Sequence, residues 1–343
     1  MERKTCLVTG VAGFIGSHLA ERLIRDGHFV IGVDCFSDYY PRWMKENNLA
    51  QLRRDARFHF IEADLLELDL AALLRGESSS IRQRAMGDNA RWDAGDGHVD
   101  YVFHLAAQAG VRESWGRNFD IYVRSNILTT QRLLEAAKEL PLMKLVYASS
   151  SSIYGDAEAF PTSEDVTPHP VSPYGVTKLA GEHLCLLYWR NYGVPAVGLR
   201  YFTVYGPRQR PDMAFHRFIR SILEGMEIPV YGDGEQTRDF TYVDDAVEGT
   251  VRAAFADVAG DAFNIGGGSR ISVNGVIRLL EGITNKRAQV RYLAPGRGDV
   301  RHTSADIRHA ARALSYAPRA TLADGLRSER EWFRSLERER VVE

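Results

Sequence analysis

Cysteine is scarce in this chain, and long apolar runs are missing. Its three cysteines, Cys6, Cys35 and Cys185, are odd in number, widely spaced and set in apolar segments. This pattern argues against a disulfide framework or a zinc site, so we expect buried, reduced thiols and no metal. No apolar run approaches the ~18 residues that a membrane helix needs. The chain enters a strand directly, without a signal peptide, and we therefore expect a cytoplasmic protein.

An excess of charge of one sign is also lacking. The formal net charge is −2, which argues against a nucleic-acid or membrane surface as partner. A hydrophobic content of 45% and a charged content of 26% are those of an ordinary globular protein. At 343 residues the chain is long enough for one large domain or two modest ones.

The first half alternates short apolar runs with amphipathic stretches. We predict strands at residues 6–9, 29–34, 58–61, 101–105 and 145–148, and helices at 15–25 and 127–139. Alternation of this kind indicates an α/β fold, with a doubly wound parallel sheet of the Rossmann type. Such a sheet binds its ligand beyond the carboxyl ends of its strands, where the strand order reverses.

Two regions break the alternation. Residues 76–97 lack periodicity and are rich in Ser, Gly, Asp and Arg, so we expect a surface insertion there. From about Gly206 onward the elements become shorter, with Gly and Pro between them. We therefore predict a Rossmann domain over 1–200 and a smaller α/β substrate lobe mainly over 201–343, with segments interleaved between the two.

A glycine-rich turn follows the first predicted strand and opens a helix. Its glycines are Gly10, Gly13 and Gly16. Such a turn lets the backbone approach a pyrophosphate, and the helix N-terminus adds free N–H groups and a positive dipole. Asp34 ends the second strand, where its carboxylate can accept hydrogen bonds from the adenosine ribose and would repel a 2′-phosphate. We therefore expect NAD rather than NADP, with Asp64 near the adenine edge or acting as a helix cap.

A second set of candidate residues follows the fifth strand. This strand leads into consecutive serines at 149–152, and Tyr174 and Lys178 lie four apart on one predicted helix face. A tyrosine hydroxyl has an ordinary pKa of ~10, too high for a base at neutral pH. We expect the Lys178 ammonium and the nicotinamide ring to lower it, and a serine to donate to the reacting oxygen.

With these motifs the chain resembles the extended short-chain dehydrogenase/reductases, specifically the nucleotide-sugar epimerases. The resemblance covers nearly the whole chain and rests on TGVAGFIGSHL, HLAAQAGVRES, YASSSSIYGD, SPYGVTKLAGE, RYFTVYGPRQRPDMAF and TRDFTYVDD. It implies catalysis by Ser150, Tyr174 and Lys178, and a homodimer formed through two helices of each subunit.

The resemblance also implies contacts with the ligands. NAD would be held by Gly10, Gly13, Phe14, Ile15, Gly16, Asp34, Asp64, Leu65, Leu105, Ala106, Ala107, Asn126, Lys178 and Tyr201. The uridine diphosphate of the substrate would be held by Phe215, Val230, Arg238 and Asp299, and Arg112 would also bind the substrate. The sequence departs from the family at Thr129, where many members have glycine after the helix-opening Asn126. In PGRGDVRHT the expected arginine is shifted, so the diphosphate contact is Arg297, Arg301 or neither.

The serine run narrows the reaction. Family members that dehydrate the sugar carry Thr-Asp-Glu at this point, and those that decarboxylate UDP-glucuronate carry Thr-Ser-Glu. Ser150, Ser151 and Ser152 stand there in this chain, so no second acid or base is available to eliminate water. Oxidation followed by re-reduction of the same carbon then remains, which is epimerisation at carbon 4.

Among epimerases, the chain most resembles those that act on UDP-glucuronate. Thr203, Arg210 and the hydroxyls of Ser151 and Ser152 form a polar set able to bind a carboxylate at carbon 6. Alternatively, Arg210 is a loop arginine and the serines are strand-end caps. Epimerases of UDP-glucose or UDP-N-acetylglucosamine are the nearest alternative, and a catalytically silent NAD-sensing protein is a distant one.

Overall fold

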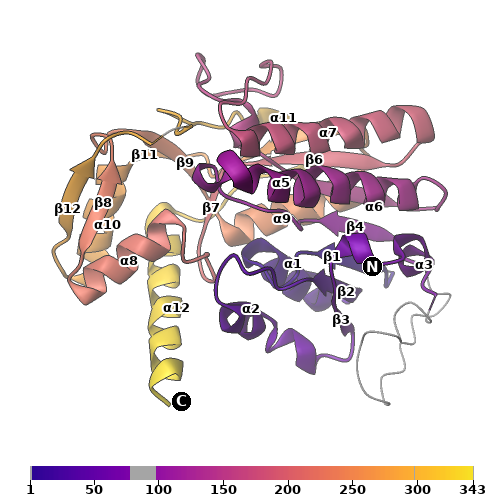
Figure 1. The fold of residues 1–343 in the computed structure, drawn as a ribbon, viewed down its shortest axis with the longest axis horizontal. Coiled ribbons are helices and arrows are strands. Elements are labelled where there is room, and N and C mark those ends of the chain that lie inside the picture. Colours follow the sequence, from indigo (N-terminus) through magenta and orange to yellow (C-terminus); the bar gives the residue numbers. More distant parts are fainter. Residues whose placement is uncertain (1, 78–97, 297, 343) are drawn as a thin grey trace.

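A computed structural model describes residues 2–77, 98–296 and 298–342. Its largest element is a seven-stranded parallel sheet in the order β10-β6-β5-β4-β1-β2-β3. The strands are β1 (Thr5–Thr9), β2 (Phe29–Asp34), β3 (Phe58–Glu62), β4 (Tyr101–His104), β5 (Lys144–Ser150), β6 (Ala196–Tyr201) and β10 (Asp261–Ile265). The strand order reverses between β1 and β4, which confirms the predicted Rossmann-type fold (Figure 1).

Helices cover both faces of this sheet, and side chains alternate between the two. Along β1, Cys6 and Val8 belong to one apolar cluster and Leu7 to another. The cluster of Cys6 includes side chains of α1 (Phe14–Arg25), α9 (Val243–Phe255) and α11 (Arg308–Leu314). The cluster of Leu7 includes side chains of α3 (Leu70–Leu74), α6 (Thr129–Ala137) and α7 (Pro173–Tyr192). Because both faces are buried, the strands are continuous apolar runs, which is why they could be predicted.

All the predicted strands are present, within two residues of their predicted bounds. Strands β6 and β10 extend the sheet beyond them. Since β10, α9 and α11 come from the C-terminal part of the chain, residues after 200 contribute both to the large sheet and to a smaller lobe. The exact division into two domains stays a prediction.

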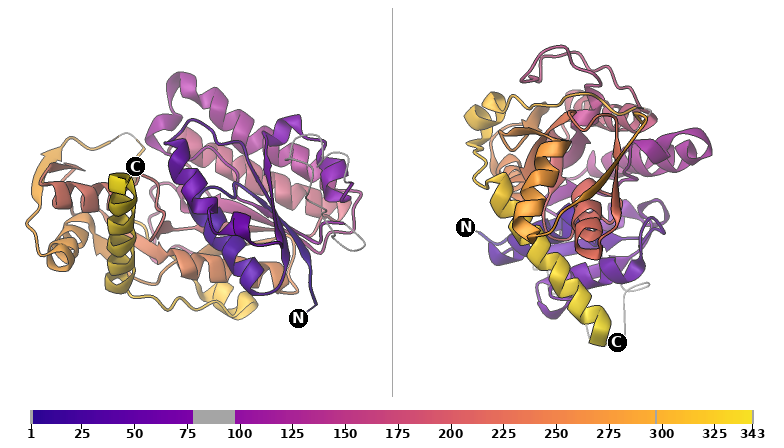
Figure 2. Two further views of the ribbon diagram at one scale, coloured as in Figure 1. Left: turned by 90° about the horizontal axis from the view of Figure 1, so that it is seen from below. Right: turned by 90° about the vertical axis from the view of Figure 1, so that its left-hand side faces the viewer.

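The smaller lobe contains two short sheets and the helices packed on them (Figure 2). One sheet has the order β11-β9-β7 and the other the order β12-β8. Its strands are β7 (Thr203–Tyr205), β8 (Glu227–Tyr231), β9 (Thr237–Tyr242), β11 (Arg270–Ser272) and β12 (Gln289–Leu293). Its helices are α8 (Ala214–Glu224), α10 (Val273–Thr284) and α12 (Leu322–Val342). Because β7 follows β6 directly, this lobe is joined to the edge where the large sheet's strands end.

One predicted helix begins earlier than expected. Instead of starting at residue 127, the helical stretch starts with α5 (Phe119–Tyr122) and passes through the π-helical segment η5 (Val123–Leu128) into α6. Asn126 therefore lies inside a π-helical turn and does not open a helix. Such turns insert an extra residue into an α-helix and often occur at functional sites.

Shorter elements complete the described residues. They are α2 (Arg42–Leu49) and the 3₁₀ turns η1 (Leu52–Arg54), η2 (Leu65–Glu67), η3 (Arg112–Ser114), η4 (Gly116–Asn118) and η6 (Ser151–Ile153). Among the described helices, none is long and apolar enough to cross a membrane. Cys6 and Cys185 are buried as predicted, but Cys35 is exposed. That prediction was wrong because Cys35 is the first residue after β2, where the chain leaves the sheet. The predicted insertion lies outside the described residues except for its first two.

Candidate active site

The turn between β1 and α1 is built around a close contact with the loop after β4. Gly10 has φ +71°, and a Cβ added there would lie 2.8 Å from the Ala106 nitrogen. A Cβ on Gly16 would lie 2.2 Å from the Gly10 carbonyl oxygen. Gly13 is the N-cap of α1 and offers no side chain to bind the first N–H groups of the helix. The turn thus has the close backbone approach and the free helix N-terminus that suit a pyrophosphate.

Two carboxylates follow the next strands. The Asp34 carboxylate accepts hydrogen bonds from the Ala12 nitrogen at 3.1 Å and the Phe36 nitrogen at 2.9 Å, and burial raises its pKa. Asp64 caps η2 by accepting from the Leu66 nitrogen at 2.9 Å, and its other oxygen lies 3.2 Å from an Arg124 nitrogen. Asp64 can therefore cap η2 and also lie near the adenine edge of NAD, since it lines the cavity described next.

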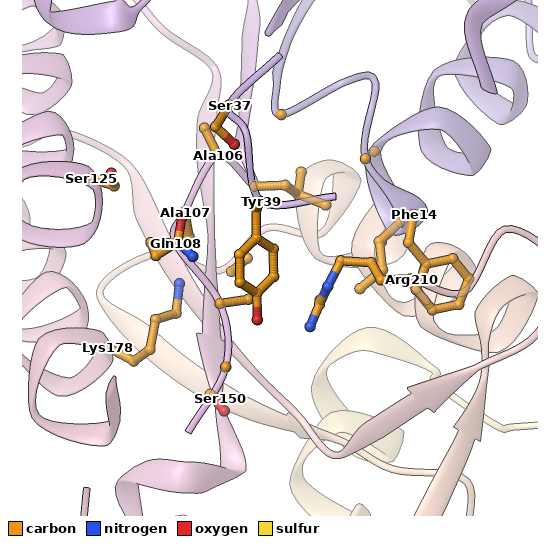
Figure 3. Close-up of a pocket in the computed structure, with 18 of the residues that line it drawn as sticks. Phe14, Ser37, Tyr39, Ala106, Ala107, Gln108, Ser125, Ser150, Lys178 and Arg210 are labelled. Atoms are coloured by element: carbon orange, nitrogen blue, oxygen red, sulfur yellow. The ribbon is translucent and has the colours of Figure 1, made fainter. Parts of the chain in front are cut away.

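A cavity of about 460 Å³ lies at the carboxyl ends of the strands, next to the point where their order reverses (Figure 3). We refer to it as the first cavity. The cofactor residues named from the sequence that line it are Gly10, Gly13, Phe14, Ile15, Gly16, Asp34, Asp64, Leu65, Leu105, Ala106, Ala107, Lys178 and Tyr201. The remaining one, Asn126, is not among its lining residues.

Asn126 is buried and acts on the neighbouring backbone. Its side-chain oxygen accepts from the Gln108 nitrogen at 2.7 Å, and its amide donates to the Gln108 carbonyl and to Thr177 Oγ1, each at 3.0 Å. Thr177 in turn donates to the Tyr174 carbonyl at 2.8 Å. Asn126 therefore ties the loop after β4 to α7, and its predicted contact with the cofactor stays a prediction.

The candidate catalytic residues meet in the first cavity. Ser150 ends β5, its hydroxyl accepts from the Ser152 nitrogen at 3.1 Å, and Tyr174 lines the same cavity. Tyr174 and Lys178 lie in the first two turns of α7, which Ser172 caps by accepting from the Gly175 nitrogen. In Figure 3 the Lys178 ammonium points into the cavity beside Gln108. It also lies 4.7 Å from the centre of the Tyr147 ring.

Burial dominates the electrostatics of these residues. Burial raises the pKa of Tyr174, while the neighbouring Ser150 hydroxyl and the positive charge of Arg210 act to lower it. Burial lowers the pKa of Lys178 to about 8. In the protein by itself, desolvation outweighs the nearby positive charge, which is that of Arg210. The expected lowering of the tyrosine pKa by Lys178 together with the nicotinamide ring stays a prediction.

The predicted carboxylate-binding residues also line the first cavity. They are Ser151, Ser152, Thr203 and Arg210. The Arg210 guanidinium pairs with the carboxylate of Asp212, from Nε to Oδ1 at 3.0 Å and from Nη2 to Oδ2 at 2.9 Å. Ser150 is a strand-end cap as well as a cavity residue, and the choice between the two alternatives for Ser151 and Ser152 stays a prediction.

A second cavity of about 870 Å³ lies over the smaller lobe and shares Tyr39, Gly110, Val111, Thr203 and Met213 with the first. The predicted diphosphate and uridine residues that line it are Arg112, Phe215, Val230, Arg238 and Asp299, together with Arg301. Arg297 lies outside the described residues.

Charged side chains are already paired along the second cavity. The Arg112 guanidinium lies 2.6 Å from Asp299 and 4.0 Å from the centre of the Tyr231 ring. Arg301 pairs with Asp233 at 2.8 Å. Arg238 donates to the carbonyl oxygens of Thr237 and Arg301, and burial lowers its pKa.

Sequence reasoning missed several cavity residues. Tyr39 and Asp212 come from the loops after β2 and β7, and Gln108 and Gly110 come from the loop after β4. The Asp-Tyr-Tyr and Arg-Pro-Asp segments that hold Tyr39 and Asp212 were visible in the sequence, but nothing in their spacing shows that they meet.

A parallel sheet with this glycine-rich turn and a Ser–Tyr–Lys set beyond its strand ends defines an enzyme that uses a nicotinamide dinucleotide. The NAD dependent epimerase/dehydratase family model matches residues 6–266, and the chain belongs to this family. The match confirms the predicted family and NAD as the cofactor.

Relatives cover the chain almost completely. It is 45% identical over 332 residues to the "uncharacterized UDP-glucose epimerase YtcB" of Bacillus subtilis (96% of this chain, 98% of the relative). It is 39% identical to the UDP-glucuronate 4-epimerase of Thermodesulfobacterium geofontis (95% of each). The crystal structure of UDP-glucuronic acid 4-epimerase from Bacillus cereus in complex with UDP-glucuronic acid and NAD matches with a TM-score of 0.88 and 45% identity, covering 97% of this chain and 99% of that one.

Proposed function

We propose that this protein is an NAD-dependent UDP-sugar 4-epimerase that interconverts UDP-glucuronate and UDP-galacturonate. The observation that carries the proposal is the combination found in the first cavity. Arg210, Thr203, Ser151 and Ser152 lie there in the same cavity as Ser150 and Tyr174. A cation and hydroxyls beside a proton-transfer pair suit a sugar with a carboxylate at carbon 6. The relatives named above for UDP-glucuronate support this choice.

The residues around the first cavity fit NAD. The close contacts at Gly10 and Gly16 leave room for a pyrophosphate against the α1 N-terminus. The oxygens of Asp34 each accept one backbone N–H, so each keeps a lone pair for a ribose hydroxyl. Its charge disfavours a 2′-phosphate. When bound, NAD accepts a hydride from carbon 4 and returns it.

The chain's own residues would move the proton. Tyr174, which lines the first cavity together with Ser150, takes the proton from the carbon-4 hydroxyl, and Ser150 donates to the oxygen as it becomes a ketone. The Lys178 ammonium, whose pKa is lowered by burial to about 8, would bind the nicotinamide ribose of the cofactor. Its positive charge would favour the tyrosinate. The 4-keto sugar then turns about its diphosphate bonds, and Tyr174 returns the proton on the other face.

The serine run supports epimerisation over dehydration. In this structure Ser150, Ser151 and Ser152 all line the first cavity. Hydroxyl groups with an ordinary pKa cannot act as the second acid and base that loss of water requires. The uridine diphosphate would occupy the second cavity, with Phe215 and Val230 against the uracil and Arg238 near the phosphates.

A panel of UDP-sugars, incubated with the purified protein and analysed by NMR, tests the proposal. We expect UDP-galacturonate from UDP-glucuronate. Turnover of UDP-glucose or UDP-N-acetylglucosamine alone would favour the neutral-sugar alternative, and no turnover of any sugar would favour the NAD-sensing protein. Arg210→Ala should raise KM for UDP-glucuronate tens of fold, since an ionic hydrogen bond contributes about 2–3 kcal/mol. An equal effect on UDP-glucose would contradict the carboxylate assignment.

A homodimer in the cytoplasm completes the proposal. Apolar side chains are exposed on α5, η5 and α7, which lie together on one face of the molecule (Figure 1). Examples are Leu128 with 39% and Leu187 with 54% of the residue surface exposed. Exposed apolar groups gathered on one face favour self-association. Light scattering should give twice the mass of the chain, and a monomer would contradict this part.

A further inference from the structure

Three loops far apart in the sequence meet beside Arg210. Its guanidinium lies 5.6 Å from the centre of the Tyr39 ring and points toward that ring in Figure 3. The Tyr39 hydroxyl donates to Asp212 Oδ2 at 3.3 Å. A Cβ on Gly110, whose φ is +107°, would lie 2.5 Å from the same hydroxyl. The lack of a side chain at Gly110 therefore makes room for the Tyr39 hydroxyl, which donates a hydrogen bond to Asp212.

The Arg210–Asp212 pair uses one particular edge of the guanidinium. An arginine carries five N–H donors, one on Nε and two on each Nη. Asp212 accepts from Nε and Nη2, so the side edge of the fork is occupied. One Nη1 donor and the second Nη2 donor form the end edge of the guanidinium. That edge is itself a pair of parallel donors, which is the arrangement that receives a carboxylate with two hydrogen bonds.

We infer that Asp212 is a specificity-determining positioning residue, which holds the side edge of Arg210 so that its end edge is presented to the carboxylate of the substrate. The inference rests on the proposed function. Asp212 does not contact the reacting atoms. It neutralises Arg210 and fixes its direction, and Tyr39 holds Asp212 in turn.

Fixing this arginine also has a consequence for the chemistry. The 4-keto form of UDP-glucuronate is a β-keto acid. When the bond between carbons 5 and 6 breaks, carbon dioxide leaves and the bonding electrons move into the carbon-4 carbonyl. The enolate then takes up a proton at carbon 5 and becomes a 4-keto pentose nucleotide. This requires the carboxylate bond to stand perpendicular to the ketone plane, and a guanidinium with a fixed direction holds the carboxylate away from that orientation.

Asp212→Asn tests the inference directly. Asparagine keeps one acceptor of the fork but places an amide N–H₂ against the other nitrogen, so Arg210 loses its fixed edge. Binding is measured by calorimetry with the NAD-loaded protein in a Tyr174→Phe background, which removes turnover. We expect the Kd for UDP-glucuronate to rise about tenfold, as for one misplaced ionic hydrogen bond, and the Kd for UDP-glucose to stay within about twofold. Tyr39→Phe should also raise the Kd for UDP-glucuronate relative to the Kd for UDP-glucose, but by less than Asp212→Asn does.

The chain offers a matched control. Arg42 and Glu62 also form a two-bonded pair, through Nη1 and Nη2 at 2.7 Å each, and neither residue lines the first or the second cavity. Glu62→Gln should leave both constants unchanged. In the enzyme with Tyr174 intact, Asp212→Asn should also release more UDP-pentose than Glu62→Gln does.

Two results would overturn the inference. A lower Kd for UDP-glucuronate in Asp212→Asn would show that Asp212 competes with the substrate for Arg210. Equal effects on the two sugars would show a structural role. If Arg210→Ala changes the Kd values for UDP-glucuronate and UDP-glucose equally, the proposed function fails. If Arg210→Ala removes the preference for UDP-glucuronate but Asp212→Asn keeps it, only the positioning role of Asp212 is ruled out.

Discussion

Lys178 is buried, with 3% of its surface exposed, and replacing it by methionine should stabilise the fold while abolishing turnover. Methionine has a similar length and fills the same space without a charge. Burial lowers the pKa of the ammonium from 10.5 to about 8. The folded protein therefore binds fewer protons than the unfolded chain between these values. Its stability should rise with pH through this window, and the full cost applies at pH 7.

The magnitude follows from the pKa and from one contact. The shift of Lys178 to about 8 corresponds to a destabilisation of about 3 kcal/mol at pH 7. The ammonium lies 4.7 Å from the centre of the Tyr147 ring, and this cation–π contact stabilises the folded protein by about 1 kcal/mol. We therefore expect Lys178→Met to raise the free energy of unfolding by about 2 kcal/mol at pH 7, and by less as the pH approaches 10.

Urea unfolding at several pH values between 7 and 10 measures this difference. The protein must first be freed of nucleotide, because bound NAD stabilises the folded state of the wild type by mass action. Lys138→Met is the control, since Lys138 pairs with Glu135 at the surface and its replacement should leave the stability nearly unchanged. A Lys178→Met protein that is less stable than the wild type, or a difference that does not shrink with pH, would refute the reasoning.

Three further substitutions address the cavity and its support. Tyr174→Phe should lower turnover by about 10² or more, because it removes the proton-transfer hydroxyl, and NAD content measured by absorbance should stay constant. Glu182→Gln leaves the Arg200 charge, paired at 2.7 Å and buried, without its partner, and urea unfolding should show a loss of about 3–5 kcal/mol. Gly16→Ala places a Cβ 2.2 Å from a carbonyl oxygen and should weaken NAD binding at least about tenfold. Gly282→Ala, which has open space around it, should leave NAD binding unchanged.

Local patterns made much of the large sheet predictable. Strand β2 was predicted residue for residue as 29–34, because a strand covered on both faces is apolar along its whole length. The turn at Gly10 was predictable because its three glycines follow a strand and open a helix within one short run of sequence. Strand β10 was missed, since its run Asp-Ala-Phe-Asn-Ile includes polar residues that are bonded only through distant segments. One of these, Asn264, donates to the carbonyl oxygens of Thr162 and Asp306.

The helix type around Asn126 could not be predicted from the local sequence either. Hydrophobic spacing predicts an α-helix there, and no local signal marks the six-residue π-helical segment. The π-helical segment is stabilised by hydrogen bonds of Asn126 to Gln108 and Thr177. These two residues lie 18 and 51 positions away in sequence. A contact that decides the local backbone can therefore be invisible in the local sequence.

Charge at the site depends on the fold in a further way. From the sequence, Lys178 was the natural cation to act on Tyr174, since it lies one helical turn away. In the structure Arg210, 36 positions away, is the positive group that lowers the tyrosine pKa, against a larger effect of burial that raises it. Asp212 partly cancels that charge through its two bonds to Arg210. The residue proposed to read the substrate's carboxylate and the residue proposed to move its proton are thus coupled electrostatically. A bound carboxylate would further weaken the help that Arg210 gives to Tyr174, so Lys178 and the positive nicotinamide ring must supply most of the stabilisation of the tyrosinate during turnover.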